Sequence, residues 1–514
     1  MRPGAALRLA LAGTRTDAAR VALTALSALL ATLAGLAALT VLAIPTPSHR
    51  STGPGTDWSE QVSNNWSEQY SNALLREPGL RGGTAFALLL LTIPVLALAG
   101  QCARLGAPAR DRRLAAVRLA GATPGQVTGL AVLETGLASL LGTVVGLAVY
   151  LGGRELLHRP DGRGQLALPT DVLPPAGAVA AVVLGLPVVA ALATALMLRR
   201  VTTTPFGVVR RVRARGPRPW PGLLILAGLA AFSAIRPLGL WYDRRSSEPP
   251  DWLLPGLLVT GGLAAMIGVV TGAGWISYTV GRILHRWARR PATLLAARRL
   301  TADPWAGSRT FAALLAAVLL GAGAAGLRAH FEAALVLTRR VGGGMRDDPF
   351  YLDTMDLVDL TVAVAMLIAA GGLVVAVVEG VTARRRAYAA LVATGVPRST
   401  LGRAIGWQAL APAVPAIAVA LTVGLLLARG LFGTPSGGGY EQTVCDAGPP
   451  CDDPATRAAY TRTEWVPEVT VPPAVPLEQL AALGGGALAA VLMTVAAGVL
   501  LLRTSTVVEE LRTT

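Results

Sequence analysis

The feature that most constrains this chain is a series of ten long apolar blocks. A helix needs ~20 apolar residues to cross the hydrocarbon core of a bilayer. Only 15% of the residues are charged, whereas soluble domains have about 25%. The blocks therefore predict an all-α integral membrane protein with about ten transmembrane helices. They lie at residues 21–44, 83–103, 127–151, 175–198, 220–240, 253–280, 310–328, 357–379, 404–428 and 477–502.

Three of these blocks have individual features. The block at 21–44 follows a long basic segment and exceeds a signal-peptide apolar core, so we expect a retained anchor. The block at 220–240 has only about fifteen clean apolar residues before Arg236, which predicts a short or tilted span. In the third block Gly142 and Gly146 are one helical turn apart. Such a pair predicts ordinary close packing between helices.

The basic residues predict the topology independently of hydropathy. All 46 are arginine, and 30 of them lie in the two terminal segments and in alternate segments between spans. Only five carboxylates lie there. By the positive-inside rule these segments are cytoplasmic, which predicts a multi-pass plasma-membrane protein with both termini in the cytoplasm. The segments are 1–20, 104–118, 199–218, 282–309, 384–403 and 503–514.

The same arginines account for the net charge of +16. A strongly basic chain can indicate nucleic-acid binding. Here the arginines gather at span ends, where anionic lipid headgroups attract them. The lipid bilayer is therefore the expected partner of these charges, and nucleic acid is not.

A short internal repeat lies on the predicted cytoplasmic side. Residues 112–122 read RRLAAVRLAGA, residues 386–396 read RAYAALVATGV, and the two align without a gap. Each copy lies between the second and third span of a group of four, which favours duplication over chance similarity. Such pseudo-symmetry is common in transport proteins. The repeat predicts a 4+2+4 arrangement, with a first module at 1–200, a central two-span hairpin with linkers at 201–291, and a second module with a cytoplasmic tail at 292–514.

Each copy of the repeat has the spacing of a short helix. In the first copy Leu114, Val117 and Gly121 recur at i, i+3 and i+7, which places them on one helical face. Arginines flank this apolar stripe, and the glycine ends the helix before the next span. Two interpretations stay open, namely an interfacial helix that only anchors the bundle and a docking surface for a cytoplasmic partner.

The repeated pattern also resembles a known family. A basic pair, an Ala-rich apolar helix, an Arg-x-x-Gly-Ala-Thr ending and a long span resemble the FtsX-like (MacB-type) permease family of ABC transporters. The pattern occurs at 112–127 and 386–401. The family usually has a glutamate after the basic pair, where this chain has Arg113 and Ala387. The chain also lacks the large extracytoplasmic domain of many relatives, since its outer loops leave room only for small caps.

This resemblance implies that segments 104–126 and 382–403 contain coupling helices that dock onto a separate cytoplasmic ABC ATPase subunit. A P-loop needs a lysine in G-x-x-x-x-G-K-[ST], and the chain has no lysine. We therefore expect a chain that is not an enzyme and holds no cofactor, the ATP being bound by the partner subunit. The docking residues implied are Arg112, Arg113, Leu114, Val117, Arg118, Gly121, Arg385, Arg386, Tyr388, Leu391 and Gly395.

Two carboxylates lie within or at the end of predicted spans, where charge is costly and often functional. Glu134 is in the third span, and the repeat aligns it with Gln408. Two interpretations stay open for Glu134. It has a functional role, or its charge is simply satisfied by Arg118 or by a position at the protein surface. Glu379 ends the eighth span beside Arg384, which favours an interfacial ion pair.

The cysteines and histidines indicate no catalytic or metal centre. Cys445 and Cys451 lie close together in the last outer loop, where an oxidising environment predicts a disulfide and the alternative is two free thiols. Cys102 is expected to be a small buried residue. The four histidines are scattered over different loops, so no metal site is expected.

The leading functional hypothesis is a permease subunit of an ABC transporter that exports a substrate or transmits force to an extracytoplasmic partner. A secondary transporter would fit the repeat, but no chain of intramembrane carboxylates supports ion coupling. A membrane sensor or scaffold is a further alternative, although the short outer loops offer little room for a ligand domain.

Overall fold

The computed structural model describes residues 15–45, 69–76, separate positions between 81 and 95, 119–202, 216–250, 252–341, 350–445, 451 and 459–505. Within these residues nine helices are long and apolar enough to cross a membrane. The prediction of an all-α membrane protein is therefore confirmed. The predicted second span, 83–103, falls mostly outside the described residues, so the count of ten stays a prediction.

The described part of the chain is mostly helical and contains two small strand pairs. The long helices are α2 (Arg15–Ala43), α8 (Pro124–Leu157), α9 (Ala176–Thr202), α10 (Trp220–Asp243), α11 (Leu253–Arg286), α13 (Pro304–Val341), α14 (Phe350–Ala383), α16 (Arg398–Phe432) and α18 (Leu477–Ser505). Three further helices are short: α4 (Ala73–Arg76), α12 (Pro291–Ala302) and α15 (Arg385–Ala393). The strands are β1 (Ser436–Gly437), β2 (Tyr440–Cys445), β3 (Thr461–Val466) and β4 (Val469–Thr470).

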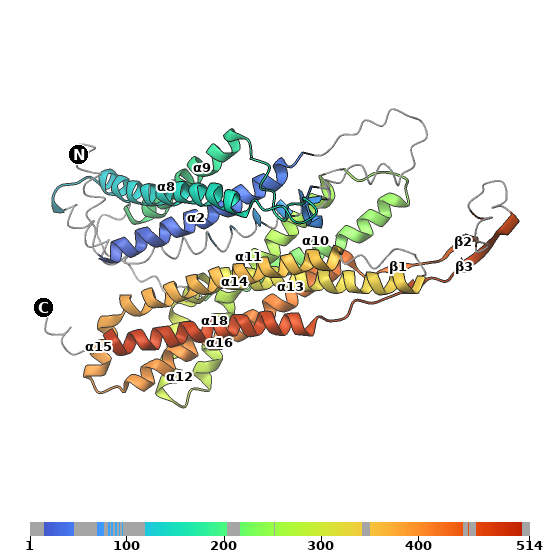
Figure 1. Cartoon of the computed structure of the whole chain (residues 1–514). Helices are drawn as coiled ribbons and strands as arrows, with labels where there is room; N and C mark the ends of the chain where they lie inside the picture. The colour runs from blue at the N-terminus through green and yellow to red at the C-terminus, as the bar shows by residue number, and fades with distance from the viewer. Residues whose placement is uncertain are drawn as a thin grey trace.

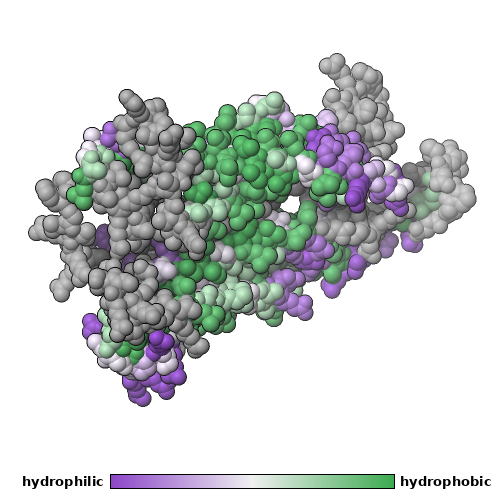
Figure 2. Space-filling model, turned by 60° about the vertical axis from the view of Figure 1, so that its left-hand side comes forward, coloured by the Kyte–Doolittle hydropathy of each residue, from purple (hydrophilic) through white to green (hydrophobic). Residues whose placement is uncertain are grey.

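The helices expose large apolar side chains where a soluble protein would bury them. Leu141, Leu184, Leu226 and Leu367 are each more than half exposed. Figure 2 shows such residues as an apolar band across the middle of the molecule, with hydrophilic residues towards its two ends. A lipid environment explains this distribution, because apolar surface is not driven out of hydrocarbon as it is out of water.

The long helices form two bundles. The helices α2, α8 and α9 pack on one another, while α13, α14, α16 and α18 form a second bundle (Figure 1). The hairpin of α10 and α11 packs against α13 and α16 of the second bundle, a docking that the sequence did not reveal. The antiparallel β2–β3 ribbon projects at the end of the molecule opposite to α12 and α15 (Figure 1).

Of the two alternatives for the span at 220–240, a short span is wrong, and a tilted span stays a prediction. Helix α10 runs for 24 residues and continues through Arg236 and Pro237. The guanidinium of Arg236 lies against Gly433 at the C-terminal end of α16. A cation is favourable beside the partial negative charge of a helix C-terminus, which explains how the helix carries an arginine so far along its length.

The glycine pair in α8 packs against α2. A Cβ atom at Gly142 would overlap the carbonyl oxygen of Ala25 and lie 2.8 Å from the Cβ of Ala28. A Cβ atom at Gly146 would lie 3.0 Å from the Cβ of Thr32. The prediction of close helix packing at this pair is confirmed, and the absence of side chains lets the two backbones approach closely.

This contact predicts different effects for two glycine substitutions in the same helix. Gly142→Ala should destabilise the protein by about 1–3 kcal/mol, the usual effect of overpacking. Gly152→Ala is the matched control, because a Cβ atom there meets nothing within 4 Å, and it should leave stability unchanged or raise it by about 0.5–1 kcal/mol. Thermal unfolding in detergent measures both. Equal unfolding temperatures for the two variants would contradict the packing described.

A polar cluster closes the end of the first bundle at which α2 and α8 terminate. Tyr70 is fully buried, forms an isolated bridge with Leu166, and donates its hydroxyl proton to Asp171 at 2.8 Å. Arg81 is also buried and donates to the carbonyl oxygens of Leu75 and Ile44 at 2.7 and 3.2 Å. Burial, followed by the hydrogen bond to Asp171, raises the pKa of Tyr70 from 10.0 to about 12.

The raised pKa of Tyr70 predicts an alkaline loss of stability. The contribution is fully present below pH 10, the unfolded value, and is lost as the pH rises towards 12, by up to about 2–3 kcal/mol. Tyr70→Phe lacks the titrating hydroxyl, so it should be less stable than the wild type at pH 8 and lose that deficit by pH 11.5. Thermal unfolding at the two pH values measures the gap, and a constant gap would refute the assignment.

Candidate coupling site

Helix α15 forms a tight link between two membrane-crossing helices. Arg384 alone separates it from α14, and residues 394–397 separate it from α16. At its C-terminus the N–H of Val396 bonds to the carbonyl of Leu391, and the N–H of Gly395 bonds to that of Val392. This is a Schellman motif, which needs a left-handed residue, and Gly395 has φ 92°. The predicted glycine-terminated helix is confirmed here.

The first copy of the repeat also ends in a left-handed glycine. Gly121 has φ 91°, and α8 begins at Pro124, the position that aligns with Arg398 at the start of α16. Thr123 caps α8 through a capping box with Gln126. The predicted docking residues of this copy from Arg112 to Arg118 lie outside the described residues.

The helix α15 is amphipathic, with one face buried in the second bundle. Tyr388 is only 3% exposed, and Leu391 and Val392 pack beside it. These side chains contact residues of α14, α16 and α18, namely Val377, Val381, Leu401, Ile405, Leu501 and Leu502. The opposite face presents Ala387, Ala390, Ala393 and Thr394. The short helix α15 is therefore fixed to three long helices, with a face of small residues left exposed.

An arginine of α12 holds α15 from the side. The Nη1 atom of Arg299 donates to the Tyr388 hydroxyl at 2.5 Å and lies 3.5 Å from Oε1 of Gln408 in α16. The Cζ atom of Arg299 is 4.9 Å from the centre of the Tyr388 ring, within the range of a cation–π interaction. In the sequence, Arg299 was only one of the arginines that indicate the cytoplasmic side of the membrane. Its spacing did not indicate Tyr388 as its partner.

The remaining predicted residues lie in separate places. The backbones of Arg385 and Arg386 begin α15, but their side chains lie outside the description. Glu379 is half-buried in α14, one turn before the helix ends, and Glu134 is buried in α8 of the other bundle. The predicted Cys445–Cys451 disulfide is present and joins the last residue of strand β2 to Cys451.

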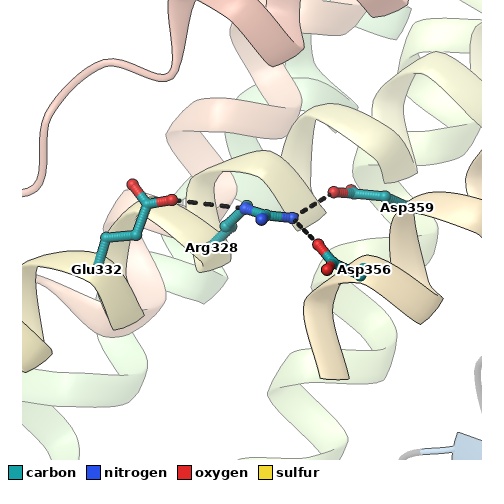
Figure 3. A network of polar contacts seen from close by, with 4 residues as sticks. All are labelled: Arg328, Glu332, Asp356 and Asp359. Carbon is teal, nitrogen blue, oxygen red and sulfur yellow. Dashed lines mark hydrogen bonds and ion pairs between the residues drawn. The ribbon is translucent and has the colours of Figure 1, made fainter. Parts of the chain in front are cut away.

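A network that the sequence reasoning missed joins α13 to α14. The Nη1 atom of Arg328 contacts Asp356 and Asp359, each at 2.8 Å, and its Nε atom lies 3.4 Å from Glu332 (Figure 3). Two of the three carboxylates belong to α14 and point towards the arginine of α13 (Figure 3). One cation therefore ties the two helices together at a distance from α15. The charges were visible in the sequence, but their pairing depends on helix rotation.

Beyond this network α13 reaches the strands. Leu337 and Val341 of α13 pack beside Gly437 of β1, which pairs with β4. The β2–β3 ribbon follows directly, with Tyr440 opposite Val466 and Cys445 opposite Thr461. A continuous set of contacts thus runs from α15 through α14 and α13 to the ribbon.

The fold and the repeated segment define a polytopic membrane permease. The family model FtsX-like permease C-terminal matches residues 83–206 and 360–507, which together make up more than half of the chain. The chain therefore belongs to the FtsX-like permease family, and the two matches contain one copy of the repeat each, as expected for two permease modules. Members of this family are non-enzymatic membrane components that work with an ABC ATPase. No curated protein and no solved structure matches the chain.

The anchoring of α15 predicts a graded response at Tyr388. Tyr388→Phe keeps the buried ring and the cation–π contact but loses the hydrogen bond, so it should cost about 0.5–1.5 kcal/mol. Tyr388→Ala also removes the ring from the core and should cost about 3–5 kcal/mol. Thermal unfolding of both variants measures the difference. Similar losses would show that the ring does not anchor α15.

The Arg328 network predicts that the positive charge of Arg328 contributes more to stability than the carboxylates around it. Arg328→Gln leaves three carboxylates together and should destabilise the protein by about 1–3 kcal/mol, less than for a fully buried pair because the aspartates are partly exposed. Adding Asp356→Asn and Asp359→Asn to that variant should recover part of the loss. Unfolding temperatures test this, and no recovery would mean that charge pairing is not what joins the helices.

Proposed function

We propose that the chain is the membrane subunit of an ABC transporter and couples ATP hydrolysis by a separate cytoplasmic ATPase to export or to force transmission across the plasma membrane. The observation that carries this proposal is the anchored helix α15, which leaves a face of small residues outside the bundle. Membership of the FtsX-like family supports it, since such permeases normally work with an ATPase.

The proposed topology follows the arginine distribution. The end of the molecule that carries α12 and α15 is cytoplasmic, as are both termini, and the β2–β3 ribbon is extracytoplasmic. Residues 1–200 and 292–514 would be the two modules, and 201–291 the central hairpin. The repeat gives each module one coupling helix, so the ATPase would meet the permease at two equivalent places.

In the proposed mechanism rigid helices move, and this chain catalyses no reaction. A push on α15 is transmitted to α14 because a single residue joins the two helices. Arg328 passes the movement from α14 to α13, and the contacts of Leu337 and Val341 pass it to β1. ATP itself is bound by the partner, because a chain without lysine has no P-loop lysine.

The proposal predicts that the outer face of α15 is needed for ATPase binding. Ala390→Trp places a bulky side chain on that exposed face and should lower the amount of co-purified P-loop ATPase about tenfold, as expected at the centre of an interface. Ala459→Trp is the matched control, because Ala459 is also exposed but lies near the ribbon at the opposite end.

The measurement is affinity purification of each tagged variant from membranes of its native host, with the ATPase identified by mass spectrometry and by ATP hydrolysis of the eluate. Thermal unfolding checks that both variants are folded. The proposal fails if the wild type recovers no P-loop ATPase, or if the two variants recover equal amounts.

A further inference from the structure

Exposed arginines flank helix α15 along the chain and on the neighbouring helix α12. Arg384 directly precedes α15, and Arg398 begins α16 shortly after α15 ends. Arg298 is next in sequence to Arg299, the residue of α12 whose guanidinium donates to the Tyr388 hydroxyl of α15. The side chains of Arg298, Arg384 and Arg398 are all exposed. These three residues are called the α15 arginines below.

Few carboxylates balance this positive charge. The described carboxylates at this end of the second bundle are Asp303, which follows α12, and Glu379 in α14. Each has an interaction within the chain, as does Arg398. Glu379 is half-buried, so Asp303 is the exposed carboxylate among the described residues here. The described surface around α15 is therefore positive, and a protein that covers it must supply negative charge, because like charges opposed across an interface repel each other.

The stability of the fold does not account for the position of Arg398. It is the first residue of α16, where the partial positive charge of a helix N-terminus makes a cation unfavourable. The first turn of α16 has no acidic residue to compensate. The positive-inside rule explains arginines on the cytoplasmic side of a membrane, but it does not require one at a helix N-terminus. A carboxylate supplied by a partner would offset this repulsion.

A second basic surface, at the junction of α11 and α12, has a different character. Arg286 and Arg290 are exposed there beside Trp287, which is 75% exposed, and Leu294, which is 42% exposed. Arginines beside exposed bulky apolar residues are typical of a helix at the membrane interface. The described side chains that α15 itself exposes are alanines, with no bulky apolar group to enter the acyl region. The α15 arginines therefore fit an acidic protein surface better than a lipid surface.

We propose that the ATPase partner presents a carboxylate-rich surface to α15 and that the α15 arginines bind these carboxylates. Arginine suits this role because its planar fork binds both oxygens of a carboxylate. The alanine face of α15 then allows close approach between the arginines. This inference rests on the proposed function, and it adds the chemistry of the surface that the ATPase must present.

The first test is the salt dependence of the complex. Tagged wild type is immobilised with the P-loop ATPase that it recovers from membranes of its native host, and it is washed in about 50 or about 500 mM NaCl. The higher salt should lower the retained ATPase about tenfold, because salt screens exposed charges.

Charge reversal identifies the residues responsible. The double variant Arg384→Glu, Arg398→Glu should retain about tenfold less ATPase at the lower salt and lose most of the salt dependence. The matched control is Arg244→Glu, Arg462→Glu, which changes the net charge equally at exposed positions beyond the C-terminus of α10 and on β3. It should behave like the wild type. Thermal unfolding checks that both double variants are folded.

A second variant tests the contact with the charge retained. The chain has no lysine, so Arg398→Lys creates its only lysine side chain. A carbodiimide joins a lysine amine to a carboxylate in direct contact, with loss of water. It should therefore link this lysine to an aspartate or glutamate of the bound ATPase, which mass spectrometry of the linked peptides identifies. Arg462→Lys, on β3 at the opposite end, should give no such link (Figure 1).

The outcomes separate this inference from the proposed function. A wild type that recovers no P-loop ATPase overturns both. If the ATPase is recovered but is retained equally at the two salt concentrations, or equally by the two double variants, the acidic surface is wrong and the proposed function stands. Bound ATPase that forms no link through Arg398→Lys has the same meaning.

Discussion

The burial of Tyr388 is the contact on which the position of helix α15 depends. A nine-residue helix has little stability of its own in water, so α15 keeps its position only because its apolar face is fixed to α14, α16 and α18. Arg299 adds a polar contact from α12 to the same ring. Because both ends of α15 join long helices within a few residues, any displacement of this short helix is also a displacement of the bundle.

The bilayer imposes the second constraint. Backbone groups within hydrocarbon must be hydrogen-bonded internally, so the chain crosses the membrane as helices and places its strands beyond α13 and α16. Charged groups near these spans are then held by specific partners. Arg328 is placed between carboxylates of its own helix and of α14, and Arg236 lies at the end of α16. These contacts join separate helices to one another.

The sequence predicted much of the fold but little of the site. Apolar blocks indicated the spans, because hydropathy depends on composition, and the positive φ of Gly121 and Gly395 followed from the role of glycine at helix ends. The alternative of a short span at 220–240 arose because Arg236 interrupts the apolar run. The sequence could not show that the guanidinium of Arg236 lies against Gly433 at the C-terminal end of α16. The partners of Tyr388 and Arg328 depend on tertiary packing, which local spacing does not encode.

We propose that a movement of α15 reaches the β2–β3 ribbon through α14 and α13. The most direct measurement is the distance between spin labels at Gly162, in the loop after α8, and Thr463, on β3, in lipid nanodiscs that contain the ATPase. We expect this distance to change when ATP is added to the wild type and to stay fixed when Arg328 is replaced by glutamine. An unchanged distance in the wild type, or an equal change in the Arg328 variant, would contradict the account.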